Sequence, residues 1–294
     1  MTDIRLKNIS PAQQKRLSHI DFRVNFLGSI ARHDLMNRFG IKEAAATRDI
    51  AEYRKLVEEN VDYDQSRKIY TRSENFKPLF DYSVSQVLTA LSEGFGEDFI
   101  GNQKPMITCE TPFQLNTPPL EVLSVLARAI HQKKAVHITY RSIRSGEGTR
   151  VIVPFALINN GERWHVRTFD RKRSIFMDCV ITRISDPTLI DDPIEEHEMR
   201  DLDRQWNRIV ELEIVAHPRL KNPETIEFEY GMKDKVLKIS IRASSAGYFL
   251  RRWNIDCSEE HSQNGEEIYL WLRNSAALYG VSNMLLTPGY QEKK

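Results

Sequence analysis

The stretch Arg163-Trp-His-Val-Arg-Thr-Phe-Asp170 lies near the middle of the chain and alternates apolar with polar side chains. A turn-forming run, Asn-Asn-Gly-Glu, comes directly before it, so we predict a β-strand that leaves a hairpin. Side chains alternate between the two faces of a strand, which puts Trp164 and Val166 opposite His165 and the arginines. Three more basic residues follow at 171–173. This hairpin therefore predicts an anion-binding pocket.

Other segments of strand character surround this hairpin. They are the alternating or apolar runs at residues 136–140, 151–158, 175–177 and 180–184. Together with the hairpin strand they give five short strands at close spacing, which predicts a small β-barrel. An amphipathic helix precedes them over residues 119–133 and ends at two lysines, where cations stabilise a helix. We therefore expect a middle domain over residues 119–190.

The N-terminal eighty residues predict three helices and a hairpin. Ser10, Pro11 and Gln13 have the layout of a capped helix start, and apolar residues then recur at spacings of three and four. A short second helix ends at Gly40, and a third begins near Lys42. Two short alternating segments follow around a basic tip. Helix, glycine turn, helix and hairpin is the pattern of a winged helix-turn-helix.

The third helix has two different faces. Ala46, Ile50, Tyr53 and Val57 lie on one stripe and are expected to pack inward. The other face combines small residues, which allow close approach, with two arginines and a lysine. Residues 1–80 also carry 15 Lys and Arg against 11 Asp and Glu, whereas the rest of the chain has 27 against 30. This balance permits a polyanionic partner at the N-terminal end; the alternative is a helical bundle whose charged face only meets water.

This domain resembles the winged helix-turn-helix of bacterial transcription regulators, through the run Phe39-Gly40-Ile41 and the run Ala46-Thr-Arg-Asp-Ile50 followed by a wing. The resemblance implies that Thr47 and Arg48 enter the major groove, where arginine can bridge two acceptors of guanine. It implies that Asp49 stabilises the helix locally and that the wing holds phosphate. The predicted DNA-binding residues are Lys42, Ala44, Thr47, Arg48, Arg54, Lys55, Arg67 and Lys68.

The middle domain resembles a WYL domain, a ligand-sensing module of bacterial regulators with an Sm-like β-barrel fold. The similarity rests on the helix and on Tyr140-Arg141-Ser142, Pro154-Phe155-Ala156-Leu157, Trp164-His165-Val166, Asp170 and Arg183-Ile184. The Trp-Tyr-Leu run that names the family is Trp-His-Val in this chain. Histidine keeps a ring with a polar atom but loses the phenol, and an unperturbed imidazole titrates near pH 6.5.

The resemblance implies a pocket for an anionic or nucleotide-like effector. Arginine suits phosphate because its planar fork donates two parallel hydrogen bonds, and tyrosine or histidine can stack on a base. The alternative is that Arg167 and Arg173 only pair with Asp170 and Asp178 at the barrel surface. The predicted pocket residues are Tyr140, Ser142, His165, Arg167, Arg173 and Arg183. The remaining arginines nearby are expected to be surface charge: Arg141, Arg144 and Arg150.

The rest of the chain predicts a connector at residues 81–118 with one helix from Ser83 to Phe95, then an acidic linker and a C-terminal α+β module at residues 206–294. The elements expected in this module are strands at 210–216, 226–230, 237–241 and 268–272 and a helix at 244–253. The module resembles the extension that often accompanies WYL domains and contributes to dimerisation. Its aromatic residues fit either a core or an interface: Tyr248, Phe249 and Trp253.

Composition and motifs limit the function. Hydrophobic residues make up 40% and charged residues 28% of the 294 residues. No apolar run approaches the roughly 20 residues of a membrane span, and the N-terminus has no secretion signal. Cys109, Cys179 and Cys257 form neither a disulfide framework nor a metal knuckle. Because phosphate-loop, zinc-protease and nucleophile-elbow motifs are also missing, we expect a cytoplasmic protein that is not an enzyme and has no metal or cofactor.

The whole chain predicts a multidomain α+β protein with a winged helix-turn-helix at residues 1–80, a central Sm-like β-barrel and a C-terminal α+β dimerisation module. This order resembles the WYL regulators found beside bacterial anti-phage defence systems, such as the BREX-associated repressor family. The resemblance implies a homodimeric repressor that binds double-stranded DNA at an inverted-repeat operator and releases it on sensing an effector. Two alternatives stay open: an activator of the same architecture, and an accessory protein whose barrel binds RNA or single-stranded DNA.

Overall fold

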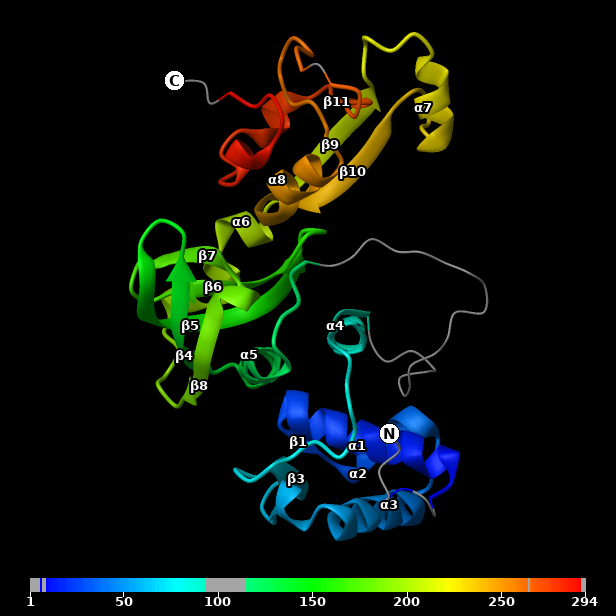
Figure 1. Cartoon of the computed structure of the whole chain (residues 1–294), viewed down its shortest axis with the longest axis vertical. Helices are drawn as coiled ribbons and strands as arrows, with labels where there is room; N and C mark the ends of the chain where they lie inside the picture. Colours follow the sequence, from blue (N-terminus) through cyan, green and yellow to red (C-terminus); the bar gives the residue numbers. More distant parts are fainter. Residues whose placement is uncertain (1–5, 7–8, 94–114, 264, 292–294) are drawn as a thin grey trace.

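The computed structural model describes residues 6, 9–93, 115–263 and 265–291. Three bodies follow one another along the long axis of the molecule, with the N-terminal helices at one end and the C-terminal module at the other (Figure 1). The predicted multidomain α+β class is confirmed. None of the helices in the described ranges combines the length and the apolar character that a membrane crossing requires.

The N-terminal domain consists of three helices and a small three-stranded sheet. Ser10 caps the first helix by accepting a hydrogen bond from the Gln13 N–H at 3.3 Å, as the sequence predicts. Gly40 ends the second helix at a φ of +62°, which glycine adopts without steric cost. The sheet order is β1-β3-β2, and β2 and β3 form the wing. The elements are α1 (Pro11–Leu27), β1 (Ser29–Ile30), α2 (Arg32–Phe39), α3 (Glu43–Leu56), β2 (Val61–Asp64) and β3 (Ile69–Arg72).

Helix α1 contributes to two hydrophobic cores. Leu17 and Ile20 pack with apolar residues of α2 and α3 in the core of the N-terminal domain. Phe22 and Phe26 instead join the core of the middle domain, where they meet apolar residues of α5 (Leu120–Gln132) and of the sheet beneath it. The two domains are therefore joined through one shared helix, and not only through the chain that links them.

Buried polar groups fasten α1 to α5. The Arg128 Nη1 donates to the Asn25 carbonyl oxygen and to the Ser124 hydroxyl, both at 2.6 Å. Gln132 donates to the Leu27 carbonyl oxygen at 3.2 Å. Burial lowers the pKa of Arg128 to about 10, so this guanidinium stays charged at neutral pH. These bonds satisfy carbonyl groups near the end of α1, which have no partner within the helix.

The middle domain is a five-stranded antiparallel sheet with α5 packed against it. The strand order is β7-β6-β5-β4-β8, so β7 and β8 are the edges of the hydrogen-bonded sheet. The pairing of β5 with β6 shifts between Pro154 and Ala156, because proline has no N–H to donate to the ladder. The predicted helix and five strands are confirmed. The elements are α4 (Val84–Glu93), α5, β4 (Ala135–Ser142), β5 (Gly146–Asn159), β6 (Trp164–Asp170), β7 (Ile175–Val180) and β8 (Ile184–Ile190).

The C-terminal module is a three-stranded antiparallel sheet in the order β10-β9-β11, with α8 packed into its core. The helix predicted at residues 244–253 is confirmed as α8. Cys179 and Cys257 are buried thiols, whereas Cys109 lies outside the described residues. The elements are α6 (Arg204–Asn207), β9 (Ile209–Ala216), α7 (Pro223–Glu229), β10 (Leu237–Arg242), α8 (Ala243–Arg252) and β11 (Leu270–Leu272).

One predicted strand is a helix instead. Residues 226–230 alternate apolar and acidic side chains, yet most of them belong to α7. Pro223 begins this helix at the position where proline is favoured, and the helical turn brings Ile226 into the core. Phe228 points away from the core and is 89% exposed. The strand prediction was wrong because a period of two over so few residues cannot distinguish a strand from a helix.

Phe26→Ala tests the shared core of α1 and α5. We expect this change to lower the free energy of unfolding by about 3–5 kcal/mol, because it leaves a cavity at a side chain that is 0% exposed. The matched control is Phe228→Ala, which should leave the stability nearly unchanged. Chemical denaturation followed by circular dichroism gives both values. Equal effects of the two changes would contradict the placement of Phe26.

Candidate DNA-binding surface and ligand pocket

The residues predicted to bind DNA are all exposed. Helix α3 turns Ala46, Ile50 and Tyr53 inward, which confirms most of the predicted inward stripe, while Val57 is half-buried just after the helix. The opposite side of the helix and the tip of the wing face solvent. The exposed residues are Lys42, Ala44, Thr47, Arg48, Arg54, Lys55, Arg67 and Lys68. In the part of the chain that the structure describes, the Arg48 side chain forms no ion pair or hydrogen bond, so its guanidinium can bind an outside partner.

Two of these cations already have partners within the domain. The Lys55 Nζ lies 3.2 Å from a Glu52 carboxylate oxygen, and the Arg54 guanidinium lies 5.8 Å from the centre of the Tyr70 ring. Both contacts are exposed and individually weak. The Arg54 contact joins α3 to β3 of the wing, whereas the Lys55 pair lies within α3.

Asp49 connects α3 to α1. Its carboxylate is 2% exposed and accepts hydrogen bonds from Arg16 Nε at 2.5 Å and from Gln13 Nε2 at 3.0 Å. The sequence predicted that Asp49 would stabilise α3 locally. The contacts show instead that it fixes the orientation of α3 against another helix, because it lies on the buried side, where an unpaired carboxylate would be costly.

The wing turn is held by one carboxylate. Asp64 Oδ1 accepts hydrogen bonds from the backbone N–H groups of Ser66 and Arg67 at 2.9 and 3.1 Å, and from the Ser66 hydroxyl at 2.7 Å. These bonds lower the pKa of Asp64. Lys68 follows with a φ of 55°, in the left-handed region. The turn therefore presents Arg67 and Lys68 from a defined backbone.

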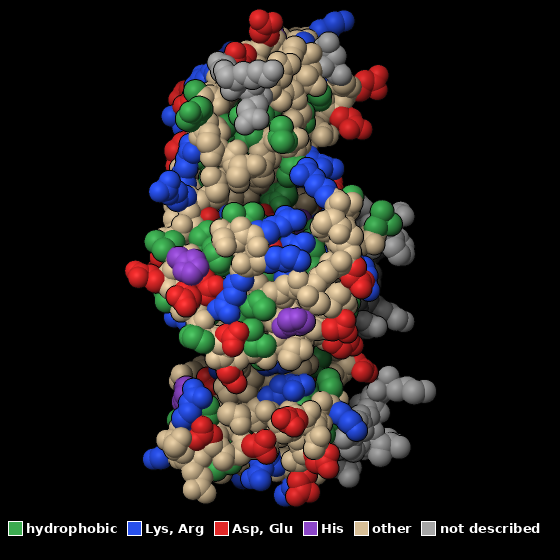
Figure 2. Space-filling model, turned by 90° about the vertical axis from the view of Figure 1, so that its left-hand side faces the viewer, with side chains coloured by type: hydrophobic (Ala, Val, Ile, Leu, Met, Phe, Trp, Pro, Cys, Tyr) green, Lys and Arg blue, Asp and Glu red, His purple; other side chains and the backbone are tan. Residues whose placement is uncertain are grey.

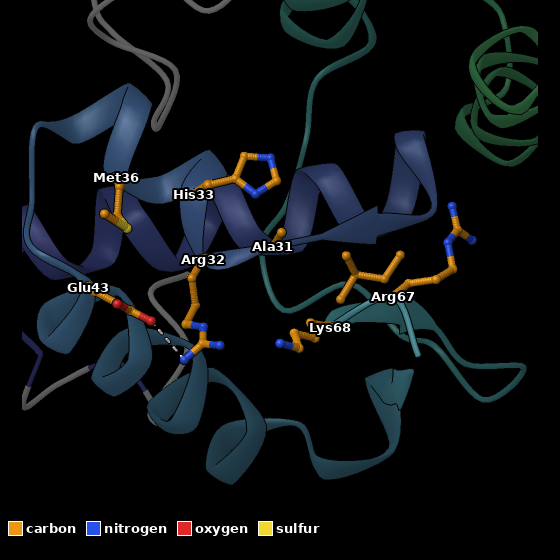
Figure 3. A pocket seen from close by; sticks show the side chains of 8 residues that line it. Ala31, Arg32, His33, Met36, Glu43, Arg67 and Lys68 are labelled. Atoms are coloured by element: carbon orange, nitrogen blue, oxygen red, sulfur yellow. Dashed lines mark ion pairs between the residues drawn. The ribbon is translucent and has the colours of Figure 1, made fainter. Parts of the chain in front are cut away.

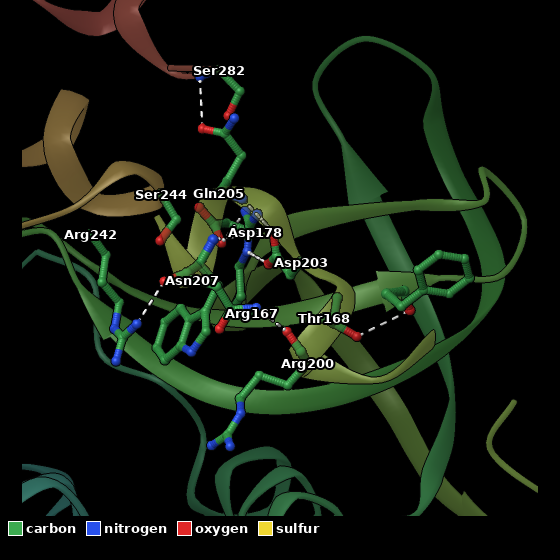
Figure 4. Close-up of polar contacts among 12 residues, drawn as sticks. Arg167, Thr168, Asp178, Arg200, Asp203, Gln205, Asn207, Arg242, Ser244 and Ser282 are labelled. Carbon is green, nitrogen blue, oxygen red and sulfur yellow. Dashed lines mark hydrogen bonds and ion pairs between the residues drawn. The ribbon is translucent and has the colours of Figure 1, made fainter. Parts of the chain in front are cut away.

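In the middle domain, Arg167 lies at the centre of a buried ionic cluster (Figure 4). Its guanidinium is held by the Asp203 carboxylate through Nε at 2.8 Å and Nη2 at 3.1 Å, and by Asp178 through Nη1 at 3.1 Å. Burial acts to lower the pKa of Arg167, but the bonds with these two carboxylates raise it overall. The pairing with Asp178 was one predicted alternative, yet Arg167 is only 4% exposed rather than at the surface.

Asp203 is a buried partner of Arg167 that the sequence analysis missed. It lies in the segment interpreted as an acidic linker, but it is 1% exposed and also caps α6, accepting from the N–H groups of Gln205 and Trp206. Glu198, in the same segment, is 2% exposed and binds Arg171 at 2.6 Å. The linker is therefore partly built into the sheet surface. An aspartate just before a short helix was the available signal.

His165 lies between the sheet and the C-terminal module. Its ring stacks on the Tyr248 ring of α8, with 5.1 Å between centroids and 24° between planes. Tyr248 donates to Asp178 at 2.9 Å, so the ring pair adjoins the Arg167 cluster. Burial lowers the pKa of His165, which keeps the imidazole neutral at pH 7. Its Nδ1 is buried and has no hydrogen-bond partner among the described residues.

The other predicted pocket residues divide into two groups. Tyr140 is buried, and its hydroxyl accepts from the Val180 N–H at 3.3 Å; burial raises its pKa, which the bonds from Val180 and Arg183 partly offset. The positive charge of Arg183 acts to lower the pKa of both Tyr140 and His165. Ser142 instead caps the β4–β5 turn, and Arg173 lies exposed beyond β6.

Arg150 is not surface charge, as the sequence predicted, but a buried residue. It is 8% exposed, binds the fully buried Asp170 at 2.8 Å, and lies 4.8 Å from the centre of the Tyr140 ring. Arg150 is buried because Asp170, the last residue of β6, places its carboxylate inside the domain. An unpaired charge would be costly there, and Arg150 supplies the opposite charge. Within the described ranges no three His, Cys, Asp or Glu side chains gather in a way that could hold a metal ion.

The three parts of the chain match three family models in the same order. Residues 12–93 match the winged helix-turn-helix domain of the BrxR transcriptional regulator. Residues 121–189 match the WYL domain. Residues 209–278 match the C-terminal dimerization domain of the BrxR transcriptional regulator.

Relatives are similar to this chain over most of its length. The chain is 31% identical over 280 residues to the DNA-binding transcriptional repressor CapW of Escherichia coli, covering 92% of this chain and 91% of the relative. It is also 31% identical over 274 residues to CapW of Pseudomonas aeruginosa, covering 89% of each chain. A solved structure, proteasome accessory factor B/C of Arthrobacter aurescens, is 12% identical at a TM-score of 0.26, covering 92% of this chain and 48% of that one.

A winged helix-turn-helix, a WYL domain and a dimerization domain on one chain define a DNA-binding transcription regulator. This chain belongs to the BrxR/CapW family of WYL-domain transcriptional regulators. That is a family of transcriptional repressors and not of enzymes, as the sequence predicts.

Asp203→Ala tests the buried cluster between the middle domain and the C-terminal module. We expect it to destabilise the protein by about 3–5 kcal/mol, because it leaves the buried Arg167 with one carboxylate instead of two. Asp201→Ala, two residues away, is the matched control, since its carboxylate is 82% exposed. Thermal and denaturant unfolding measure both. If the two variants were equally stable, the cluster would not hold the domains together.

Proposed function

We propose that this protein is a homodimeric DNA-binding repressor that reads an inverted-repeat operator with α3. The observation that carries the proposal is the exposed face of α3, where Thr47 and the unpaired Arg48 stand on a helix held rigidly from behind by Asp49 and Tyr53. The family membership supports it, because the relatives are DNA-binding transcriptional repressors. The resemblance to regulators found beside anti-phage defence systems makes a phage-defence operon the proposed target.

A two-fold dimer would present two copies of α3 to one face of the duplex. The C-terminal domain, which matches a dimerization domain, is the natural site of the two-fold contact. Recognition helices related in this way fit half-sites about 34–36 Å apart or a multiple of that spacing. An inverted repeat in the operator would mirror the symmetry of the protein.

We further propose that the effector binds where Tyr140, His165 and Arg183 converge. The support is the positive charge of Arg183, which acts on both rings, together with the buried His165 Nδ1, which has no hydrogen-bond partner among the described residues; the combination suits an anionic or nucleotide-like ligand. Arg167 has a different role in this scheme. Its guanidinium is fully engaged by Asp203 and Asp178, so it joins the pocket to the C-terminal module and does not bind the ligand.

An effector releases DNA only if it binds the DNA-incompetent state more tightly than the competent one. His165 stacks on Tyr248, and Tyr248 binds Asp178, so a ligand that displaces the His165 ring would disturb the Arg167 cluster. The surface drawn in Figure 2 also shows Lys and Arg side chains gathered near the junction of the middle and C-terminal parts, which suits the approach of an anion.

Arg48→Ala and Arg67→Ala test the DNA-reading surface. We expect Arg48→Ala to cost about 1–3 kcal/mol of binding free energy at the operator and to relax sequence preference at one base pair. Arg67→Ala should weaken binding to all duplexes and reduce the dependence on salt. Footprinting on the DNA upstream of the protein's own gene finds the operator, and fluorescence anisotropy gives the affinities.

Two results would contradict the proposal. One is wild-type affinity for the operator in both variants. The other is a preference of the wild-type protein for single strands over every duplex, which would favour the accessory role.

Arg183→Ala tests the effector site. We expect mononucleotides with one to three phosphates to raise the melting temperature of the wild-type protein, and the variant to lose that shift while it keeps its affinity for DNA. Arg141→Ala is the matched control, because Arg141 lies on the same sheet but is exposed and pairs with Glu147. Absence of any shift in the wild-type protein would exclude a nucleotide effector.

A further inference from the structure

A cavity of about 340 Å³ opens beside the DNA-reading face of the N-terminal domain (Figure 3). Its polar lining comes from three elements: Arg32 and His33 at the start of α2, Glu43 at the start of α3, and Arg67 and Lys68 at the wing tip. This lining carries two arginines and a lysine against the single carboxylate of Glu43. It therefore has an excess of positive charge.

The cavity is continuous with the exposed face of α3. Glu43 and Thr47 lie one helical turn apart, and the Thr47 hydroxyl donates to the Glu43 carbonyl oxygen at 2.9 Å. A duplex that receives Thr47 in its major groove therefore carries a backbone strand past the mouth of this cavity. In Figure 3 the Lys68 side chain extends toward Arg32, whereas Arg67 turns away from it.

The Glu43 carboxylate is already paired with Arg32, the cation that a phosphate of such a strand would bind. Its carboxylate lies 3.1 Å from Arg32 Nη1, and the two side chains are 63% and 39% exposed. Water and salt screen a pair this exposed, so it contributes little to stability. A phosphate can replace the carboxylate readily, because both accept charge-assisted hydrogen bonds from the same face of a guanidinium.

We propose that this cavity holds one phosphate of the DNA backbone and that Glu43 competes with that phosphate for Arg32. This inference rests on the proposed function and adds a contact to it. Arg32 then helps to position the protein on any duplex. Glu43 weakens the contact between Arg32 and phosphate by the same amount on every DNA sequence. Competition from Glu43 weakens specific and non-specific binding to DNA together, and this favours release of the repressor from its operator.

Glu43→Gln is the direct test, with a short mixed-sequence DNA duplex as the probe, so that the operator need not be known. We expect Glu43→Gln to tighten binding about two- to fivefold at low salt, the range of one exposed ion pair. The slope of log affinity against log salt should steepen by up to about 0.9, the value for one phosphate. Arg32→Gln should weaken binding and make the slope shallower by the same amount.

The double variant distinguishes competition for Arg32 from general repulsion of DNA. If Glu43 acts through Arg32, Glu43→Gln has no effect in a protein that already carries Arg32→Gln. The control variant is Glu147→Gln, which removes the same charge from an exposed Arg–Glu pair in the middle domain and should not change binding. Unfolding temperatures of all four variants confirm that the fold is intact.

Two results would overturn the inference. One is that Glu43→Gln leaves the affinity for the duplex unchanged. The other is that Glu43→Gln tightens binding equally with and without Arg32. Failure of the wild-type protein to bind any duplex would instead overturn the proposed function, so the two failures are distinguishable.

Discussion

Helix α1 packs in two hydrophobic cores at once, and this fixes the N-terminal domain relative to the middle domain. The buried carboxylate of Asp21 lies at its centre and accepts hydrogen bonds from Tyr53 of α3 at 2.6 Å and from Tyr82, just before α4, at 2.7 Å. Burial raises the pKa of Asp21, and these bonds act against that rise. Moving α1 would leave a buried acceptor unsatisfied and open a cavity, so α3 is fixed to the middle domain.

The middle domain is held on its other side by buried ion pairs together with ring contacts. Arg167 of β6 binds Asp203 at the start of α6, and Tyr248 of α8 binds Asp178 of β7. Buried ionic contacts of this kind depend steeply on geometry, because removing one partner leaves an uncompensated charge. The middle domain is therefore joined to the N-terminal domain through a shared apolar core, and to the C-terminal domain through buried ion pairs and ring contacts.

Much of this arrangement could be predicted from short-range patterns. The cap at Ser10, the stripe through Ala46 and Ile50 and the alternation around Trp164 each reflect contacts that repeat with the period of a helix or strand. The failures share a different cause, since each involves a long-range partner. Neither Arg150 nor Asp203 could be identified as buried from sequence, because Asp170 and Arg167 lie far along the chain. Helical periodicity was enough to predict which residues of α3 are exposed. The Arg32–Glu43 pair could not be predicted, because it depends on the angle at which α2 packs against α3.

Through α1, the helix α3 and the middle domain form one cooperative unit. Native-state hydrogen exchange tests this coupling directly, because it measures the free energy of the opening that exposes each amide. We expect the slowest amides of α3 and of α5 to exchange through the same opening, with the same free energy and the same dependence on denaturant. Exchange of α3 through a smaller, separate opening while α5 stays protected would contradict it.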